Sequence, residues 1–332
     1  MNPLVSVLLP VFNGSHTLGS AIQSILNQSF QDFELVIIDD GSTDNCAQIV
    51  NGYSDKRIRY FQREHEGLAA SLNFGISKCR GKYIARMDAD DISHIDRLTR
   101  QVQFLETKST VDLVATRVSC QSSNDNRGLD IYIEWQNNFV SHEEIYLNRF
   151  VDSPIIHPSI MARKSAFEKY GYYSTDELPE DFELWLRWLQ GGARFEKIKK
   201  ELLVWNDNPL RLTRSHPYYS KDKFCQTKAN YLAKWFQKQF SDSKPDIWIL
   251  GSGRHVFQRS NWLTHYGLEI KGFVDLESKP SSKRRIIGYN QISSLENSFF
   301  LSYVSDRAGR KNIKNFMKES GYSIGQQFYM MT

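Results

Sequence analysis

The chain has 332 residues, of which 40% are hydrophobic and 24% are charged, and its formal net charge is +4. This length is enough for two domains, and the composition excludes an intrinsically disordered chain. The small positive charge is scattered along the sequence, so it gives no basis for expecting nucleic acid as a partner.

The four cysteines lie far apart without a C-x-x-C spacing, so we expect reduced thiols in a cytoplasmic protein rather than disulfides or a zinc site. Met1 is followed almost at once by a strand-like segment, which predicts that no signal peptide is present. The apolar runs have only the length of strands, so no bilayer-spanning helix is expected. Peripheral contact with the inner face of a membrane and formation of a homo-oligomer are left open.

Short apolar runs alternate with amphipathic helices over the first hundred residues. Strands are predicted at 5–10, 34–38, 57–61 and 82–87, with helices at 15–28 and 67–78. This alternation predicts an α/β domain with a mostly parallel sheet covered on both faces. Ligands bind such sheets beyond the carboxyl ends of the strands. Three polar clusters follow strand ends, at 10–13, 39–42 and 88–91.

The second half of the chain predicts a different organisation. Helices are expected at 97–106 and 181–190, followed by a polar stretch at 206–220 and a helix at 219–239. Further strands are predicted at 246–250, 269–275 and 299–304. We therefore divide the chain into a first domain at 1–220, a connecting helix at 221–243, and a small α/β domain at 244–332.

The acidic run Asp88-Ala89-Asp90-Asp91 follows the last strand of the first domain. Hard divalent cations such as Mg²⁺ or Mn²⁺ prefer oxygen ligands and are commonly held by one or two carboxylates together with substrate phosphates. A metal at this position would neutralise charge on a diphosphate leaving group. Taken alone, the run is better explained as a solvated acidic turn that caps the helix after Ser93.

A series of motifs accompanies this run in a fixed order. They read VSVLLPVFN (5–13), SILNQSF (24–30), FELVIIDDGSTD (33–44), GLAASLNFGI (67–76), GKYIARMDADD (81–91), DRL (96–98), HPS (157–159), Arg163 and EDFELWLR (180–187). Over roughly the first two thirds of the chain this series resembles glycosyltransferase family 2.

The resemblance implies a GT-A fold, and a metal-dependent transfer of a sugar from a nucleotide diphosphate donor with inversion. It places the donor nucleotide against Pro10, Phe12, Asn13, Asp39, Asp40, Gly67, Asn73, Asp88 and Ala89. It assigns the metal, Mg²⁺ or Mn²⁺, to Asp90 and Asp88. A UDP-sugar is the expected donor, and a glycan or a lipid-linked acceptor the expected acceptor.

The resemblance also implies that Asp181 is the general base that takes the acceptor proton. Because Asp181 begins a helix, the helix dipole is expected to lower its pKa rather than to raise it; the competing interpretation of Glu180-Asp181 is a simple N-cap. His157, Glu180 and Trp185 are assigned to the acceptor side, with a structural histidine and a core tryptophan as the alternatives. Leu72 and Ile95 stand where many relatives carry arginine and proline.

The predicted small domain carries Gly251-Ser252-Gly253 after its first strand and Asp275 after its second, although the third glycine of a dinucleotide motif is replaced by Val256. It is similar to the Rossmann-like domain appended to some family 2 proteins, including those described as similar to β-1,3-N-acetylglucosaminyltransferases. Two alternatives to a transferase stay open: a non-catalytic nucleotide-sugar binder with a regulatory role, and an NAD(P)-dependent oxidoreductase.

Overall fold

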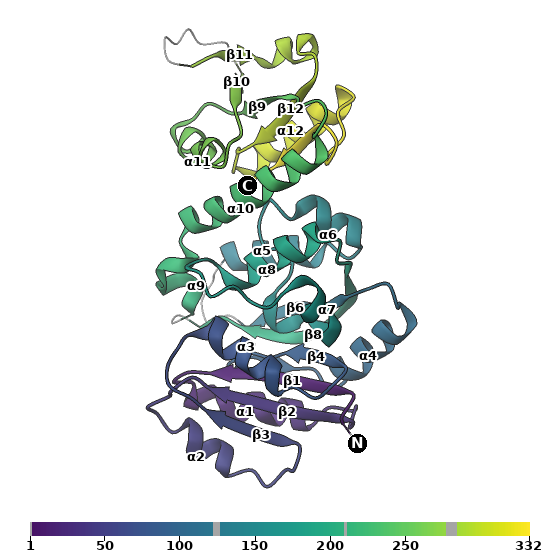
Figure 1. The fold of residues 1–332 in the computed structure, drawn as a ribbon, viewed down its shortest axis with the longest axis vertical. Coiled ribbons are helices and arrows are strands. Elements are labelled where there is room, and N and C mark those ends of the chain that lie inside the picture. Colours follow the sequence, from purple (N-terminus) through teal and green to yellow (C-terminus); the bar gives the residue numbers. More distant parts are fainter. Residues whose placement is uncertain (1, 122–126, 209–210, 277–283) are drawn as a thin grey trace. The chain divides into compact units, whose positions relative to one another are not determined.

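The computed structural model describes residues 2–121, 127–208, 211–276 and 284–332 (Figure 1). The chain forms two compact units. The first consists of Met1–Ile145 and Pro154–His216, and the second of Tyr146–Ser153 and Pro217–Thr332. A consecutive division of the chain would place Tyr146–Ser153 with the first unit, whereas its contacts group it with the second.

The first unit is built on an eight-stranded sheet of order β3-β2-β1-β4-β7-β6-β8-β5. The first four strands of this order are parallel neighbours: β3 (Ile58–Gln62), β2 (Phe33–Asp39), β1 (Val5–Val11) and β4 (Tyr83–Arg86). The sheet continues through antiparallel β7 (Met161–Arg163) to the parallel pair β6 (Leu113–Gln121) and β8 (Phe195–Asn206), and ends at antiparallel β5 (Ile92–Ser93).

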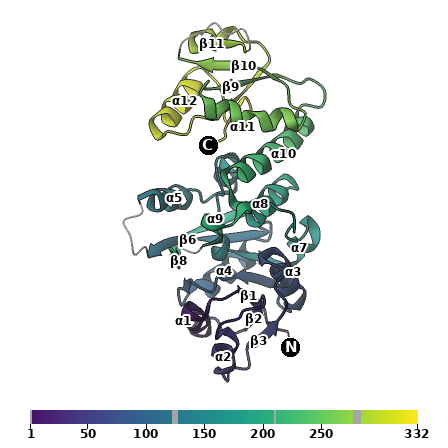
Figure 2. The ribbon, with the colours of Figure 1, turned by 90° about the vertical axis from the view of Figure 1, so that its left-hand side faces the viewer.

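Helices cover both faces of the parallel strands. Figure 2 shows α1 (Ser15–Leu26) and α2 (Cys46–Asn51) on one side of β1 to β3 and α3 (Leu68–Lys78) on the other. This arrangement explains why β1 and β2 are buried along their whole length and why their sequences are continuous apolar runs. The predicted strands and helices of the first hundred residues are all present, with ends displaced by one or two residues.

The remaining helices of the first unit lie later in the chain. They are α4 (Arg97–Thr107), α5 (Arg127–Asn137), the 3₁₀ turn η1 (His157–Ser159), α7 (Lys164–Tyr170), α8 (Glu180–Gln190) and α9 (Leu212–Ser215), while α6 (His142–Asn148) leads into the segment grouped with the second unit. α8 is strongly amphipathic and buries most of its residues, including Trp185 and Trp188.

The second unit carries a parallel five-stranded sheet of order β11-β10-β9-β12-β13. Its strands are β9 (Asp246–Leu250), β10 (Ile270–Asp275), β11 (Ile286–Gly288), β12 (Ser298–Ser302) and β13 (Phe328–Met330). The accompanying helices are η2 (Pro217–Tyr219), α10 (Lys221–Gln239), α11 (Arg254–His265), η3 (Tyr289–Ser294) and α12 (Arg307–Glu319). None of the helices in the described part of the chain combines the length and apolar composition needed to cross a membrane.

A buried arginine anchors the segment Tyr146–Ser153 within the second unit. The guanidinium of Arg149 lies 3.5 Å from the ring centroid of Tyr146, 4.3 Å from that of Phe150 and 5.1 Å from that of Tyr329. It also donates a hydrogen bond of 3.0 Å to the Tyr329 hydroxyl. Cation–π contacts strengthen when the cation is desolvated, so this cage ties the inserted segment to the last strand of the chain.

The first prediction concerns Gly81, which precedes β4. A Cβ atom at this position would lie 2.6 Å from the Ser6 nitrogen and 2.8 Å from the Val5 carbonyl carbon, and neither backbone atom can move aside. We expect Gly81→Ala to lower the free energy of unfolding by about 1–3 kcal/mol in urea titrations, as overpacking does. Gly19→Ala in α1 is the matched control, because the nearest atoms to its Cβ would be 3.9 Å away. Equal effects of the two substitutions would contradict the close approach of β1 to Gly81.

Candidate active site

Many of the predicted site residues of the first unit lie at or just after the carboxyl ends of strands, at one edge of the sheet. β1 and β2 run in register, with Val11 opposite Asp39, and β4 lies on the other side of β1 with Arg86 opposite Leu8. The carboxyl ends of three parallel strands therefore meet, as expected from the sequence. The residues that follow these strands are close in space although they are up to about eighty positions apart in the chain.

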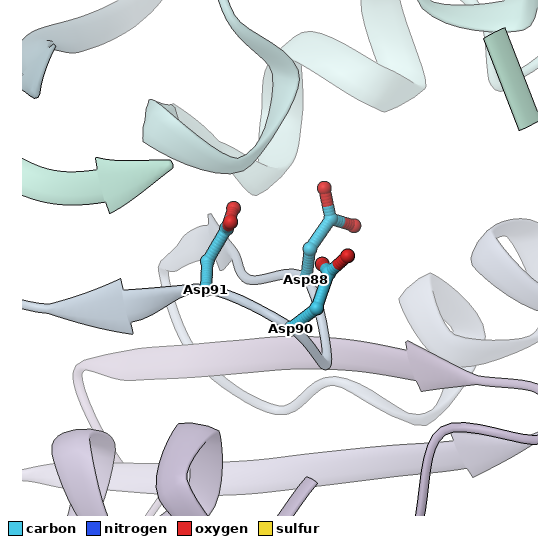
Figure 3. A group of neighbouring side chains, drawn as sticks. All are labelled: Asp88, Asp90 and Asp91. Atoms are coloured by element: carbon cyan, nitrogen blue, oxygen red, sulfur yellow. The ribbon is translucent and has the colours of Figure 1, made fainter. Parts of the chain in front are cut away.

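Three aspartates occupy the turn that joins β4 to β5. Figure 3 shows the carboxylates of Asp88 and Asp90 side by side, with Asp91 next to them just before β5. One carboxylate oxygen of each residue lies within 4.8 Å of the others. Carboxylates at this spacing repel one another unless a cation lies among them.

Neighbouring residues fix this turn from two sides. Nη2 of buried Arg86 lies 2.6 Å from Oδ1 of Asp88. Asn206, at the end of β8, donates from its main-chain N–H to Oδ1 of Asp91 at 3.0 Å and from its side chain to the carbonyl oxygen of Asp90 at 2.5 Å. Oδ2 of Asp91 is buried and has no hydrogen-bond partner among the described residues.

The electrostatics of the turn suit a divalent cation. Burial, with the charge of Asp88 added, raises the pKa of Asp90. Burial and the charges of Asp88 and Asp90 hold the pKa of Asp91 well above its usual value. A bound cation would relieve this repulsion and would give the unpartnered Asp91 oxygen a partner. A donor set made only of oxygens fits Mg²⁺ or Mn²⁺.

Asp181 lies in the first turn of α8, where its Oδ1 accepts a hydrogen bond of 2.6 Å from the main-chain N–H of Phe182. The sequence predicts a lowered pKa at this helix N-terminus, and that prediction is wrong. Part of the residue reaches solvent, yet the surrounding protein desolvates the carboxylate, and the charge of Glu180 adds to this effect. Together they raise the pKa of Asp181 to about 8. Desolvation outweighs the helix dipole because the dipole supplies only a partial charge.

The residues assigned to the acceptor side form a buried cluster beside Asp181. Nε2 of His157 lies 2.7 Å from the Tyr173 hydroxyl, and Nδ1 lies 3.9 Å from Oε1 of Glu180. The ring of Trp185 packs edge-to-face against His157 with centroids 5.7 Å apart. Trp185 has no exposed surface, which favours the core interpretation over a platform for a sugar.

Asp40, predicted near the nucleotide, is buried and its carboxylate is already engaged by the chain. Oδ1 accepts hydrogen bonds from the N–H of Glu66 at 3.1 Å and from the hydroxyl of Ser71 at 2.6 Å. Oδ2 accepts from the N–H of Gly67 at 2.9 Å. Asp40 therefore organises the loop that enters α3, where Gly67 has the positive φ of 90° that favours glycine.

Asp39, the last residue of β2, and Asn13, two residues after β1, have a similar organising role. Fully buried Asp39 accepts hydrogen bonds from the N–H of Ser42 at 2.7 Å and from the hydroxyl of Tyr60 at 2.5 Å. Asn13 donates its N–H to the Ser42 hydroxyl and accepts the N–H of Thr43, both at 2.9 Å. These bonds join the loops after the two strands into one surface.

Phe12 presents the open aromatic face of this surface. Its side chain is 48% exposed, and it stacks on His65 with ring centroids 4.1 Å apart and an interplanar angle of 21°. His65 Nδ1 lies 2.9 Å from Oδ2 of Asp40. Pro10 is buried at the end of β1, and Ala89 is half-buried in the acidic turn. A stacked, exposed aromatic pair of this kind can bind the flat face of a base.

Asn73, also predicted near the nucleotide, uses its side chain within the protein. Its amide donates to the carbonyl oxygen of Tyr173 at 2.9 Å and accepts the N–H of Tyr173 at 3.0 Å. Sequence reasoning missed three residues: Tyr173, His65 and Arg86. For Arg86 a signal was available, because a charged residue inside an apolar strand requires a buried partner.

A cavity of about 480 Å³ lies at the opposite, amino-terminal edge of β1 and β4. Arg80, Lys82, Arg163 and Lys164 line it together with Asp32 and Glu168. Three of its cations are already engaged: Lys82 with Glu106, Arg163 with main-chain carbonyls and Lys164 with the Cys79 carbonyl. The chemistry-bearing residues lie at the other edge of the sheet.

Comparisons with known proteins agree with this geometry. The sequence profile described as Glycosyl transferase family 2 matches residues 6–171. The glycosyltransferase EpsE of Bacillus subtilis is 35% identical over 224 residues, which cover 65% of this chain and 78% of EpsE. A glycosyltransferase of Rickettsia felis is 34% identical over 183 residues, covering 55% of this chain and only 29% of that protein.

Solved structures share the fold. Residues 1–349 of Staphylococcus aureus TarS, in complex with UDP-GlcNAc, superpose with a TM-score of 0.56 at 18% identity, covering 73% of this chain and 74% of the other. The TarS complex with UDP gives a TM-score of 0.55 and covers 80% of this chain and 70% of the other. The prediction of an α/β GT-A fold is thereby confirmed.

The second prediction tests the organising role of Asp40. Asp40→Ala leaves two partly buried main-chain N–H groups and the buried Ser71 hydroxyl without their acceptor, so we expect the free energy of unfolding to fall by about 2–4 kcal/mol. Amide hydrogen exchange at Glu66 and Gly67 should accelerate. Exposed Asp32→Ala is the control. Unchanged exchange at both amides in Asp40→Ala would contradict this role.

Proposed function

The chain belongs to glycosyltransferase family 2, and from this premise we propose that it transfers a sugar from a nucleoside diphosphate donor to an acceptor hydroxyl with inversion at the anomeric carbon. The observation that carries the proposal is the acidic turn 88–91 together with the desolvated carboxyl of Asp181, which the charge of Asp88 reaches and whose pKa is raised to about 8. TarS, which has the same fold, is described in complex with UDP-GlcNAc and with UDP. We extend a UDP-sugar to this chain as the proposed donor.

In this proposal Asp90 and Asp88 hold Mg²⁺ or Mn²⁺ against the donor diphosphate. Arg86 holds Oδ1 of Asp88, which leaves Oδ2 as the oxygen of Asp88 that would be available to a metal. When bound, the cation neutralises the charge that develops on the diphosphate as it leaves. Phe12 and His65 offer the stacking surface for the base, and the loops held by Asp39, Asp40 and Asn13 keep that surface in place.

Asp181 acts as the general base. As the acceptor oxygen forms its bond to the anomeric carbon, the bond from that carbon to the diphosphate oxygen breaks, and the acceptor proton passes to the Asp181 carboxylate. Attack occurs on the face opposite the diphosphate, which inverts the configuration. A carboxylate with a raised pKa is a stronger base than an ordinary aspartate, and it accepts the proton more readily.

We propose a glycan or a lipid-linked glycan as the acceptor class. The complete acidic turn and the raised pKa of Asp181 favour catalysis over a non-catalytic binder. In the second unit, the hydroxyl of Ser252 donates a hydrogen bond to Oδ2 of Asp275, so the carboxylate on which an NAD(P)-binding interpretation rests is already engaged within the chain. We therefore place the chemistry in the first unit and treat residues 244–332, which belong to the second unit, as an accessory Rossmann-like domain.

The third prediction concerns the metal. Asp90→Asn removes a charged ligand, so we expect the affinity for Mn²⁺, measured by electron paramagnetic resonance without donor, to fall at least about tenfold. Transfer activity should fall in parallel. Asp242→Asn, an exposed carboxylate of the second unit, is the control and should bind Mn²⁺ normally. Full Mn²⁺ affinity in Asp90→Asn would remove Asp90 from the metal site.

The fourth prediction concerns pH. Because the pKa of Asp181 is raised to about 8, the base is largely protonated at pH 6 and becomes competent as the pH rises. We expect kcat/KM of the native protein to rise from pH 6 and level off above pH 8 to 9. Asp181→Asn should lower kcat by about 10²–10⁴-fold, the usual contribution of a general base, with donor binding preserved.

The control for Asp181→Asn is Asp176→Asn, which removes an exposed carboxylate from the loop before α8. Donor binding in both variants is followed by the thermal shift that UDP produces in the presence of Mn²⁺. An Asp181→Asn protein that retained full transfer activity would exclude Asp181 as the base.

A further inference from the structure

A buried chain of polar side chains leads from α3 to the proposed base. It begins at Asn73, whose side-chain amide is hydrogen-bonded to the main-chain N–H and carbonyl oxygen of Tyr173. It continues through the Tyr173 hydroxyl, which lies 2.7 Å from Nε2 of His157. The other imidazole nitrogen, Nδ1, faces Oε1 of Glu180 at 3.9 Å. Glu180 is the residue directly before Asp181. Three separate segments of the first unit thus converge behind one carboxylate.

The His157 ring is held on several sides. Trp185 packs against it edge-to-face, with centroids 5.7 Å apart, and the Tyr173 ring lies 5.4 Å away on another side. Tyr173 is itself packed against Phe167, at 6.1 Å between centroids. A ring confined in this way keeps its orientation, so its two nitrogens keep different partners.

The protonation states of this chain follow from burial. Burial and the nearby charge of Arg86 hold the pKa of His157 well below its usual value, so the imidazole is neutral and carries one N–H. Burial raises the pKa of Tyr173 far above its usual value, so the phenol keeps its proton. If the Tyr173 hydroxyl donates to Nε2 of His157, the imidazole N–H must be on Nδ1. If Nε2 donates to the hydroxyl, the N–H is on Nε2.

We propose that Tyr173 and His157 are positioning residues for the base: the Tyr173 hydroxyl donates to Nε2, which places the imidazole N–H on Nδ1 facing Glu180 and keeps Glu180 ionised beside Asp181. The proposal rests on Asp181 being the general base. Tyr173 and His157 act through Glu180 and are not assigned to contact the sugar or the diphosphate.

The consequence is electrostatic. An ionised Glu180 disfavours a second charge on Asp181, as do burial and the more distant Asp88, whereas the main-chain N–H of Phe182 favours it. Among the described residues, the charge of Arg86 also acts on His157 and on Tyr173. Without the N–H on Nδ1, Glu180 would hold a proton more readily and would repel the Asp181 charge less. The pKa of Asp181 would then fall, and Asp181 would become a weaker base.

The experiment compares Tyr173→Phe with Tyr172→Phe. Tyr172 is the adjacent residue, 45% exposed, and its substitution removes a hydroxyl of the same kind. In Tyr173→Phe we expect the rising limb of the pH profile of kcat/KM to move to lower pH by about one unit, and the plateau to fall roughly tenfold. KM for the donor and the melting temperature should stay near the native values. Tyr172→Phe should match the native profile.

Two variants at His157 separate positioning from packing. The side-chain amide of His157→Asn can present an N–H where Nδ1 stood, whereas His157→Ala cannot. We expect the asparagine variant to keep the native position of the rising limb and the alanine variant to shift it as Tyr173→Phe does. A lowered plateau without any shift of the limb in Tyr173→Phe, or identical limbs in the two His157 variants, would overturn the proposal.

A second measurement is independent of the transfer reaction. Nitrogen-15 chemical shifts of labelled histidine, assigned by loss of the signal in His157→Asn, report which ring nitrogen carries the proton. We expect the Nδ1–H tautomer in the native protein and its loss in Tyr173→Phe. The Nε2–H tautomer in the native protein would overturn the proposal. If Asp181→Asn retained activity while the Nδ1–H tautomer was observed, the assignment of the base would fail and the hydrogen-bond geometry would stand.

Discussion

Repulsion among carboxylates in a partly dehydrated site is the constraint on which the rest of this structure depends. The carboxylate oxygens of the acidic turn lie within 4.8 Å of one another, and at that limit two full charges repel by about 3 kcal/mol in a medium of effective dielectric constant about 20. The charge of Asp88 also raises the pKa of Asp181, and the charge of Glu180 raises it more. The fold must therefore supply compensating charge and rigid attachment before any substrate binds.

Two buried arginines supply much of this compensating charge and of this rigid attachment. Arg86 pairs with Asp88, and the fully buried Arg97 lies beneath the turn and donates to the carbonyl oxygens of Arg86 and Ile160. Burial lowers the pKa of Arg97 to about 10, which still leaves it charged at neutral pH. Because Ile160 directly follows η1, Arg97 holds the acidic turn and the His157 segment against each other. The proposed metal site and the segment that carries His157 thus share one support.

Much of the fold could be predicted because strands buried on both faces have to be continuous apolar runs. Val5–Val11 and Phe33–Asp39 show this pattern directly, and the rule that ligands bind at the carboxyl ends of parallel strands located the edge of the site. The grouping of Tyr146–Ser153 with the second unit could not be predicted, because it depends on Arg149 meeting Tyr329, 180 residues later in the chain.

The sequence by itself determined which chemistry this protein can carry: an ordered set of motifs, an acidic turn after a strand, and an acidic pair at the start of a helix. Only the tertiary structure decided how each carboxylate behaves. Asp40 is engaged by the distant loop that enters α3, Asp91 keeps an unpartnered oxygen, and Asp181 has a raised rather than a lowered pKa. Residue type and spacing are local properties, whereas desolvation and charge repulsion depend on every group that folding brings within a few ångströms.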